Sequence, residues 1–225
     1  VAQVEEVLGR IDPAARMRHV VRRFTGLSAP EVDATRRVEV TVVTADLVGF
    51  STLATRLDPE QVMETVRGLW HLAGPLLIRH HVRPVEYRGD MIVAVAEGVV
   101  DGEGHAVRGL RFAADFVRRV GSVGAIRRLM GEDHLSMRAG VASGPVVSGL
   151  LGNYELFGFA TIGVPTNVAA RLQALASPGE VVCSGDVARA ARCHGMTCER
   201  VELKGMEHLP LDAMRIDAGR WPGAP

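Results

Sequence analysis

Cysteines and aromatic residues are scarce in this 225-residue sequence, and neither sign of charge is in excess. Its three cysteines are too few, and odd in number, for a disulfide framework, so we expect a reducing compartment, the cytoplasm. Lysine plus arginine and aspartate plus glutamate number 26 each, which leaves no net charge to attract nucleic acid. No apolar run approaches the roughly 18 residues of a membrane-spanning helix. We therefore expect neither a nucleic-acid partner nor a membrane segment in this chain.

The sequence does contain enough apolar residues for a large core. Hydrophobic residues make up 47% and charged residues 23%, a composition typical of a globular protein. Residues 1–36 are rich in arginine and are predicted to form either a helical arm or a linker. Residues 37–218 are predicted to form one domain, followed by a short tail over residues 219–225.

The order of hydrophobic patterns predicts an α+β domain. Residues 38–47 are almost wholly apolar or β-branched, as a buried central strand requires. Asp58 and Pro59 suit the N-cap and first position of a long helix, and Gly89 and Asp90 suit a two-residue hairpin turn. The remaining expected elements are a helix from residue 104, a strand pair broken at Ser143-Gly144-Pro145, a helix over 163–176, a short strand and a C-terminal hairpin. Together they predict a mixed, mainly antiparallel sheet covered by helices.

Two acidic residues are candidates for metal binding. Asp46 ends the predicted central strand, and Asp90 lies in the predicted hairpin turn. If these strands are neighbours, the two carboxylates converge at one end of the sheet, where they could hold divalent cations that bind phosphate oxygens. The alternative is structural, with Asp46 capping the next helix and Asp90 simply favouring the turn. Spacing alone leaves both interpretations open.

A second pair of polar residues lies on a predicted helix. Asn167 and Arg171 are four residues apart, so they project from one helical face. A guanidinium group is suited to the negative charge that builds on a phosphoryl group during transfer. A surface helix with solvated polar residues would show the same spacing, so this pair alone does not identify a site.

These residues belong to four longer segments: TVVTADLVGFSTLATRLDPEQV, EYRGDMIVAVAEG, RAGVASGPVVSGLLGN and IGVPTNVAARLQALASPGEVV. In this order the segments resemble the class III nucleotidyl (adenylate/guanylate) cyclase catalytic domain. The resemblance runs from about Val38 to Asp217. It implies a ferredoxin-like palm that forms a head-to-tail homodimer with active sites at the interface. It also implies conversion of a nucleoside triphosphate, ATP or GTP, to a 3′,5′-cyclic nucleotide and pyrophosphate.

The resemblance assigns roles to the two pairs of polar residues. Asp46 and Asp90 would hold two Mg²⁺ or Mn²⁺ ions. Asn167 would orient the ribose, and Arg171 would stabilise the charge on the α-phosphate in the transition state.

Further positions would bind the substrate. The backbone around Gly49 and Phe50 would approach the triphosphate, and Lys204 would lie near the phosphates, although a plain surface lysine fits its segment as well. Glu86 occupies the place where guanylyl cyclases of this family carry a glutamate, which accepts hydrogen bonds from guanine. Ala160 replaces the aspartate or threonine that adenylyl cyclases use to contact adenine. Glu86 could instead simply pair with Arg88 on the same strand face.

Three functional hypotheses follow. The leading one is an active nucleotidyl cyclase, because the metal acids and the Asn167/Arg171 pair are all present. The second is a cyclase-like regulatory domain with weak or no turnover, which the altered base-contacting position at Ala160 would favour. A diguanylate cyclase is disfavoured because the hairpin has the sequence YRGDM, which lacks a GGDEF-like turn.

Overall fold

The computed structural model describes residues 35–152, 157–193 and 197–221. The predicted arm over residues 1–36 lies almost wholly outside these ranges, as does the end of the predicted tail. Within the described ranges, no helix is long and apolar enough to cross a membrane.

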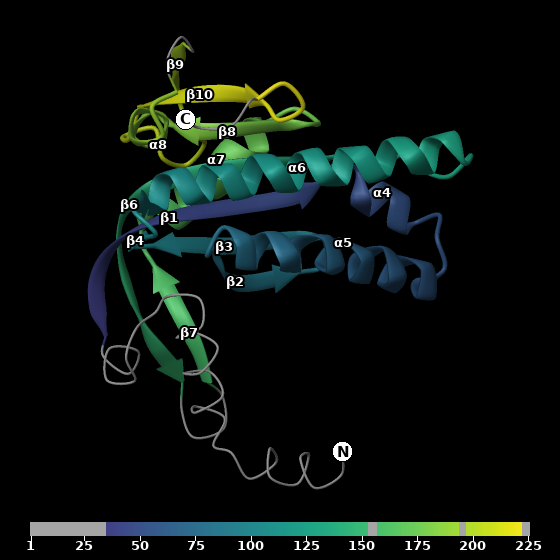
Figure 1. The fold of residues 1–225 in the computed structure, drawn as a ribbon, viewed down its shortest axis with the longest axis horizontal. Helices are drawn as coiled ribbons and strands as arrows, with labels where there is room; N and C mark the ends of the chain where they lie inside the picture. The colour runs from purple at the N-terminus through teal and green to yellow at the C-terminus, as the bar shows by residue number, and fades with distance from the viewer. Residues whose placement is uncertain (1–34, 153–156, 194–196, 222–225) are drawn as a thin grey trace, which may run out of the picture.

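The main sheet has eight strands among the described residues (Figure 1). The strand order is β2-β3-β1-β6-β8-β10-β9, with β7 paired to one end of β6. All neighbouring strands are antiparallel except β6 and β8, which confirms the mixed, mainly antiparallel sheet. The strands are β1 (Arg36–Leu47), β2 (Arg83–Arg88), β3 (Met91–Glu97), β6 (Met137–Gly152), β7 (Phe157–Ile162), β8 (Glu180–Ser184), β9 (Cys198–Val201) and β10 (Leu211–Asp217), and a separate small ribbon pairs β4 (Val99–Val100) with β5 (Glu103–Gly104).

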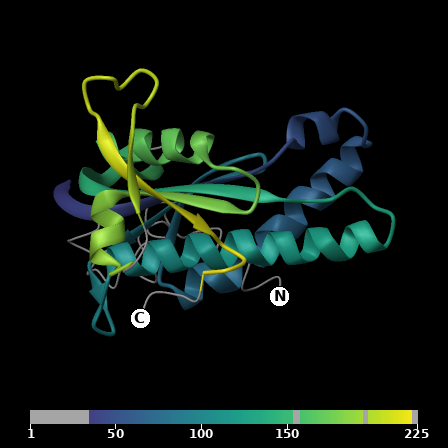
Figure 2. The same ribbon diagram turned by 90° about the horizontal axis from the view of Figure 1, so that it is seen from above.

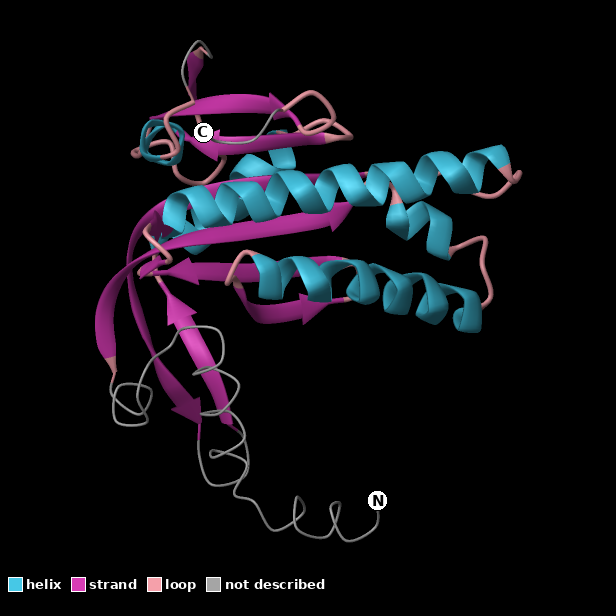
Figure 3. Cartoon of the chain, in the orientation of Figure 1, coloured by secondary structure: helices cyan, strands magenta, loops and turns pink. Residues whose placement is uncertain are grey.

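Helices cover both faces of this sheet. Helices α5 and α6 lie on one face and α7 lies on the other, as the view from above shows (Figure 2). A short helix, α4, follows the C-terminal end of β1, and α8 follows β8 (Figure 3). The helices are α4 (Phe50–Ala54), α5 (Pro59–Arg79), α6 (His105–Leu129), α7 (Val164–Leu175) and α8 (Gly185–Ala190).

Strand β1 contributes to two hydrophobic cores because its side chains alternate between the two faces of the sheet. Val43 and Ala45 belong to the core under α5 and α6, whereas Val40 and Val42 belong to the core under α7. All four are fully buried. The predicted central strand is therefore confirmed, and by the same alternation Asp46 lies on the α7 face.

The predicted start of helix α5 is also confirmed. Asp58 is the N-cap, Pro59 is the first helical residue, and Gln61 completes a capping box. In this arrangement the Gln61 side chain accepts a hydrogen bond from the Asp58 backbone N–H at 3.0 Å. Such a cap satisfies backbone donors that a helix leaves unpaired at its N-terminus.

The predicted break at Ser143-Gly144-Pro145 was wrong. Strand β6 runs without interruption from Met137 to Gly152, and it pairs with β1 from Arg36 to Leu47. Gly144 takes a φ of 155°, which a glycine adopts readily. On the other side of β6, the described pairing with β8 ends at Val141 and that with β7 begins at Val147. Pro145 therefore lies where a missing ladder hydrogen bond is tolerated.

Candidate active site

The structure brings Asp46 and Asp90 together at one end of the sheet. Asp46 is next to last in β1, and Asp90 ends the turn that leads into the neighbouring strand β3. The Leu47 backbone N–H donates a hydrogen bond to Asp90 Oδ2 at 3.2 Å, and the Asp46 and Asp90 carboxyl groups lie close enough for one to hydrogen bond to the other when it is protonated. The expected convergence of the two carboxyl groups is confirmed.

Two nearby carboxyl groups cannot both carry a charge without cost. Partial burial, the hydrogen bond to Asp46 and the negative charge of Asp46 raise the pKa of Asp90 to about 7. Near neutral pH the pair therefore tends to keep one proton between the two groups. A divalent cation could replace this proton and remove the repulsion between the carboxylates.

The donor set fits Mg²⁺ or Mn²⁺. Both side chains supply carboxylate oxygens, the ligands that hard cations prefer. Within the described ranges, no cluster of three or more His, Cys, Asp or Glu residues is arranged to hold a metal. In the magnesium sites of nucleotide enzymes, one or two carboxylates act together with substrate phosphates and water.

The turn after Asp46 leaves room for a ligand beside the backbone. Gly49 has a φ of 74°, in the left-handed region, and precedes the first turn of α4. A Cβ atom added to Gly49 would meet no heavy atom within 4 Å. Phe50 packs against the core on the α5 and α6 face and so anchors the start of α4. The glycine is needed for the backbone conformation at this turn.

Helix α7 presents Asn167 and Arg171 to solvent. It buries Val168, Ala169 and Leu172 against its own sheet, and both polar residues are exposed. The side chain of Asn167 has no hydrogen-bond partner among the described residues. The predicted shared face of Asn167 and Arg171 is confirmed, and this face is turned away from the sheet that carries Asp46 and Asp90.

The loop that carries Lys204 lies beside Arg171. A Cβ atom at Gly205 would be 4.0 Å from Arg171 Nη2. The Gly205 backbone N–H donates to Glu207 Oε1 at 2.7 Å, and this bond, followed by a hydrogen bond from the Glu207 backbone and smaller effects of the His208 and Arg171 charges, lowers the pKa of Glu207. Lys204 is exposed. No sequence pattern identified Glu207, because loop residues lack the periodicity of helices and strands.

Glu86 lies on the same face of the sheet as Asp46. It pairs with Val93 on β3, whose side chain belongs to the α7 core. The intervening residue Tyr87 points to the other face, where its ring contacts Trp70 of α5 edge-on with 4.3 Å between centroids. Arg88 Nε donates to Glu86 Oε1 at 2.6 Å, so the predicted ion pair between Glu86 and Arg88 is present.

Ala160 lies on β7, opposite Gly149 of β6. Its carbonyl accepts a 3.4 Å hydrogen bond from Ser148 Oγ. The next residue, Thr161, accepts a hydrogen bond from Arg83 Nη2 at 3.2 Å, which joins β7 to β2, the strand of Glu86. No described contact links Ala160 directly to Glu86. Sequence reasoning did not identify the contact between Arg83 and Thr161. The two residues are 78 positions apart, and neither lies in the four segments that carry the resemblance.

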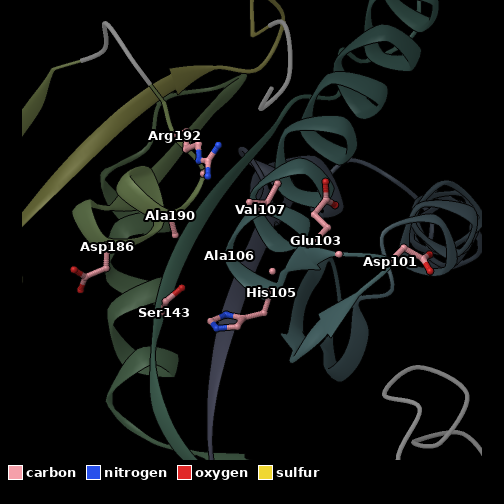
Figure 4. A pocket seen from close by; sticks show the side chains of 12 residues that line it. Asp101, Glu103, His105, Ala106, Val107, Ser143, Asp186, Ala190 and Arg192 are labelled. Carbon is pink, nitrogen blue, oxygen red and sulfur yellow. The ribbon is translucent and has the colours of Figure 1, made fainter.

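A separate cavity of about 690 Å³ lies away from these candidates, between the start of α6 and the end of α8 (Figure 4). It is on the α6 face of the sheet. Thr41 Oγ1 forms hydrogen bonds with His105 Nδ1 at 2.8 Å and with Ser143 Oγ at 2.6 Å. Burial and the charge of Arg108 lower the pKa of His105. None of the predicted site residues lines this cavity.

Comparison with known proteins shows which family this chain belongs to. A model of the adenylate and guanylate cyclase catalytic domain matches residues 32–212. Retinal guanylyl cyclase 1 of Rattus norvegicus is 32% identical over 178 residues, which cover 74% of this chain and 15% of that protein. Adenylate cyclase 1 of Rhizobium meliloti (strain 1021) is 27% identical over 162 residues, 71% of this chain and 24% of that protein. The chain thus spans only a small part of the length of these relatives.

Two solved structures share the fold. The guanylyl cyclase Cya2 has a TM-score of 0.74 and 21% identity, with 84% of this chain and 98% of that chain covered. The adenylyl cyclase CyaB from P. aeruginosa has a TM-score of 0.73 and 20% identity, with 83% and 98% covered. These likenesses confirm the expected class III cyclase fold. Because the family model covers most of the chain, this protein belongs to the family of adenylate and guanylate cyclase catalytic domains.

Proposed function

We propose that this chain is an active nucleotidyl cyclase that converts ATP or GTP to a 3′,5′-cyclic nucleotide and pyrophosphate in cytoplasmic signalling. The observation that carries the proposal is the contact between Asp46 and Asp90 at the end of β1, where partial burial and the Asp46 carboxyl hold the pKa of Asp90 near 7. A protein seldom places two acids in contact unless a cation or a shared proton compensates the repulsion. The carboxylates would hold two Mg²⁺ or Mn²⁺ ions.

The reaction forms one bond and breaks another at the α-phosphorus. The ribose 3′ oxygen attacks, the bond from the α-phosphorus to the bridging oxygen breaks, pyrophosphate leaves, and the 3′ hydroxyl proton passes to water. When bound, the divalent ions supply positive charge to the phosphate oxygens and to the attacking oxygen. Arg171 would donate hydrogen bonds to the α-phosphate as its charge grows, and Asn167 would hold the ribose in position. Lys204 and the backbone at Gly49 and Phe50 would bind the triphosphate.

The proposal includes a homodimer. Helix α7 turns Asn167 and Arg171 away from the sheet that carries Asp46 and Asp90. This arrangement favours a site in which one protomer supplies the acids and its partner supplies the α7 residues. A head-to-tail pair of identical chains would then contain two equivalent sites.

A cyclase assay with Mn²⁺ and either ATP or GTP tests the proposal, with the cyclic products separated and identified. We expect product from the wild type and loss of most activity in Asp46→Ala. Arg171→Ala should lower kcat by about 100-fold or more with a smaller change in KM, because its contact is made chiefly in the transition state. The exposed residue Asp212, which pairs with Arg200, offers a control, since Asp212→Ala should retain activity. Absence of any cyclic product from the wild type would refute the proposal.

A further inference from the structure

We infer that Arg88 contacts the purine base and, together with Glu86, selects guanine over adenine. The inference deepens the proposed function, on which it rests, by naming a specificity residue at the end of β2. The roles proposed for the metal-binding acids and for the α7 residues do not involve Arg88. The argument depends on the hydrogen bond between the two side chains, on the face to which they point, and on the groups that they leave free.

The two side chains form a pair with unused hydrogen-bonding groups. Arg88 Nε donates to Glu86 Oε1 at 2.6 Å, and within the described part of the chain neither side chain has another partner. Both terminal nitrogens of the guanidinium group and the second carboxylate oxygen therefore remain available. The Arg88 side chain is 70% exposed and that of Glu86 is 42% exposed, so a ligand can reach both.

The orientation of the pair is set from the opposite face of the sheet. Tyr87 lies between them in sequence, and its ring packs edge-on against Trp70 of α5. Because side chains alternate along a strand, this contact directs Glu86 and Arg88 to the face that carries Asp46. Arg88 pairs with Met91, and Asp90 immediately precedes Met91. The pair is therefore close, along the sheet, to the acids proposed to hold the metal ions.

The free groups match the edge of guanine. Guanine presents an acceptor at O6 and donors at N1 and at the 2-amino group. The carboxylate of Glu86 can accept from the two donors, and the guanidinium group of Arg88 can donate to O6. An arginine that donates to guanine O6 is among the commonest specific contacts between proteins and bases.

Adenine in the same position would mismatch both groups. The ribose and triphosphate fix the placement of the ring, so the 6-amino group of adenine would face Arg88 and its unprotonated N1 would face Glu86. A donor would then meet a donor, and an acceptor would meet an acceptor. Ala160 offers no side-chain polar group to compensate. Arg88 would thus supply the contact to the 6-position that an alanine at residue 160 cannot.

The test compares Arg88→Met, which keeps the length of the side chain but removes the donors, with the wild type. Cyclase kcat/KM with Mn²⁺ is measured for GTP, ATP and inosine triphosphate, which keeps O6 but lacks the 2-amino group. We expect Arg88→Met to lower kcat/KM about tenfold for both GTP and inosine triphosphate and to leave ATP unchanged or slightly improved. Arg88→Lys should recover only part of the loss, because a lysine cannot offer the planar fork. Arg189 is the matched control, since it forms a similarly exposed ion pair with Asp186, and Arg189→Met should leave all three substrates unchanged.

Two results would overturn the inference. Equal losses of kcat/KM for all three nucleotides would place Arg88 at the triphosphate, and kcat/KM values unchanged for all three would leave it an ordinary surface residue. If the wild type forms no cyclic product, the proposed function fails separately, and the base preference is then measured by displacement of a fluorescent GTP analogue with each nucleotide in Mn²⁺. In that experiment Arg88→Met should weaken the binding of GTP about tenfold relative to that of ATP. An unchanged ratio of the two affinities would again refute the contact.

Discussion

The carboxyl groups of Asp46 and Asp90 lie close enough to share a proton where β1 ends and β3 begins, and Asp90 also accepts a hydrogen bond from the Leu47 backbone. The two acids are far apart in sequence, and the antiparallel pairing of β1 with β3 brings them together. Placing two acids in contact favours a bound cation but costs stability in its absence. The pair therefore links the stability of the metal-free protein to its proposed activity.

The first prediction concerns the metal-free protein. The pKa of Asp90 is about 7 in the folded state against 3.8 for the free side chain, so its contribution to stability falls as the pH rises between these values. Asp90→Asn removes this loss. At pH 8 the substitution should raise the free energy of unfolding by about 1 kcal/mol, because solvent screens part of the repulsion at this partly exposed site. At pH 4 it should have little effect. Urea unfolding in chelator at both pH values measures this difference.

Metal addition provides the matching control. Mn²⁺ should raise the melting temperature of the wild type at pH 8 and should do so much less for Asp90→Asn, because a ligand stabilises only the state that binds it. The Asp90→Asn variant should also lose cyclase activity. An Asp90→Asn protein that is less stable than the wild type at pH 8 would show that the two acids do not repel each other.

A second prediction tests the shared site. Asp46→Ala and Arg171→Ala should each be inactive alone, and a mixture of the two should regain activity, because a mixed dimer contains one intact site. With free exchange of subunits, half of the dimers are mixed and each has one of two sites, so recovery should approach about a quarter of the wild-type rate. Activity is measured after exchange has been verified with differently tagged chains. No recovery after verified exchange would mean that each chain builds its own site.

Much of the fold could be predicted from the sequence, because local signals determined it. The apolar run of β1, the Asp58 cap of α5 and the Gly89-Asp90 turn each depend on residues close together in the chain. The break expected at Gly144-Pro145 was wrong because pairing with β1 along the whole of β6 outweighs the local preference of these residues.

The candidate site was predicted in part for the same reason. Asp46, Asp90, Asn167 and Arg171 lie in segments with strong local patterns, and the resemblance to a known family gave them roles. The position of Gly205 beside Arg171 depends on how a loop folds back toward α7, which no periodicity reveals. The hydrogen bond from Arg83 to Thr161 likewise depends on a long-range approach of β7 to β2.

A third prediction concerns stability far from the site. Arg108 of α6 is 2% exposed and donates to backbone carbonyls, among them those of His81 at 2.6 Å, Glu97 at 2.5 Å and Gly98 at 3.0 Å. Arg108→Met would leave these part-buried carbonyl groups without the guanidinium donors. We expect a loss of about 3 kcal/mol or more in the free energy of unfolding, measured with urea. Arg118→Met, at an exposed position of the same helix, should change it by less than about 1 kcal/mol. Equal effects of the two substitutions would contradict the role given to Arg108.

The last prediction concerns the choice of nucleotide. If Glu86 accepts hydrogen bonds from a guanine edge, Glu86→Lys should shift the preference toward ATP, because a donor replaces the acceptor and can bind N1 of adenine. The shift in the ratio of kcat/KM should be roughly tenfold at most, since Ala160 makes no polar contact with the base. Adding Ala160→Asp should strengthen the preference for ATP, because the new carboxylate can accept from the 6-amino group. Assays of both nucleotides with the wild type, each single variant and the double variant measure these ratios. The same ratio in all four proteins would show that Glu86 does not contact the base.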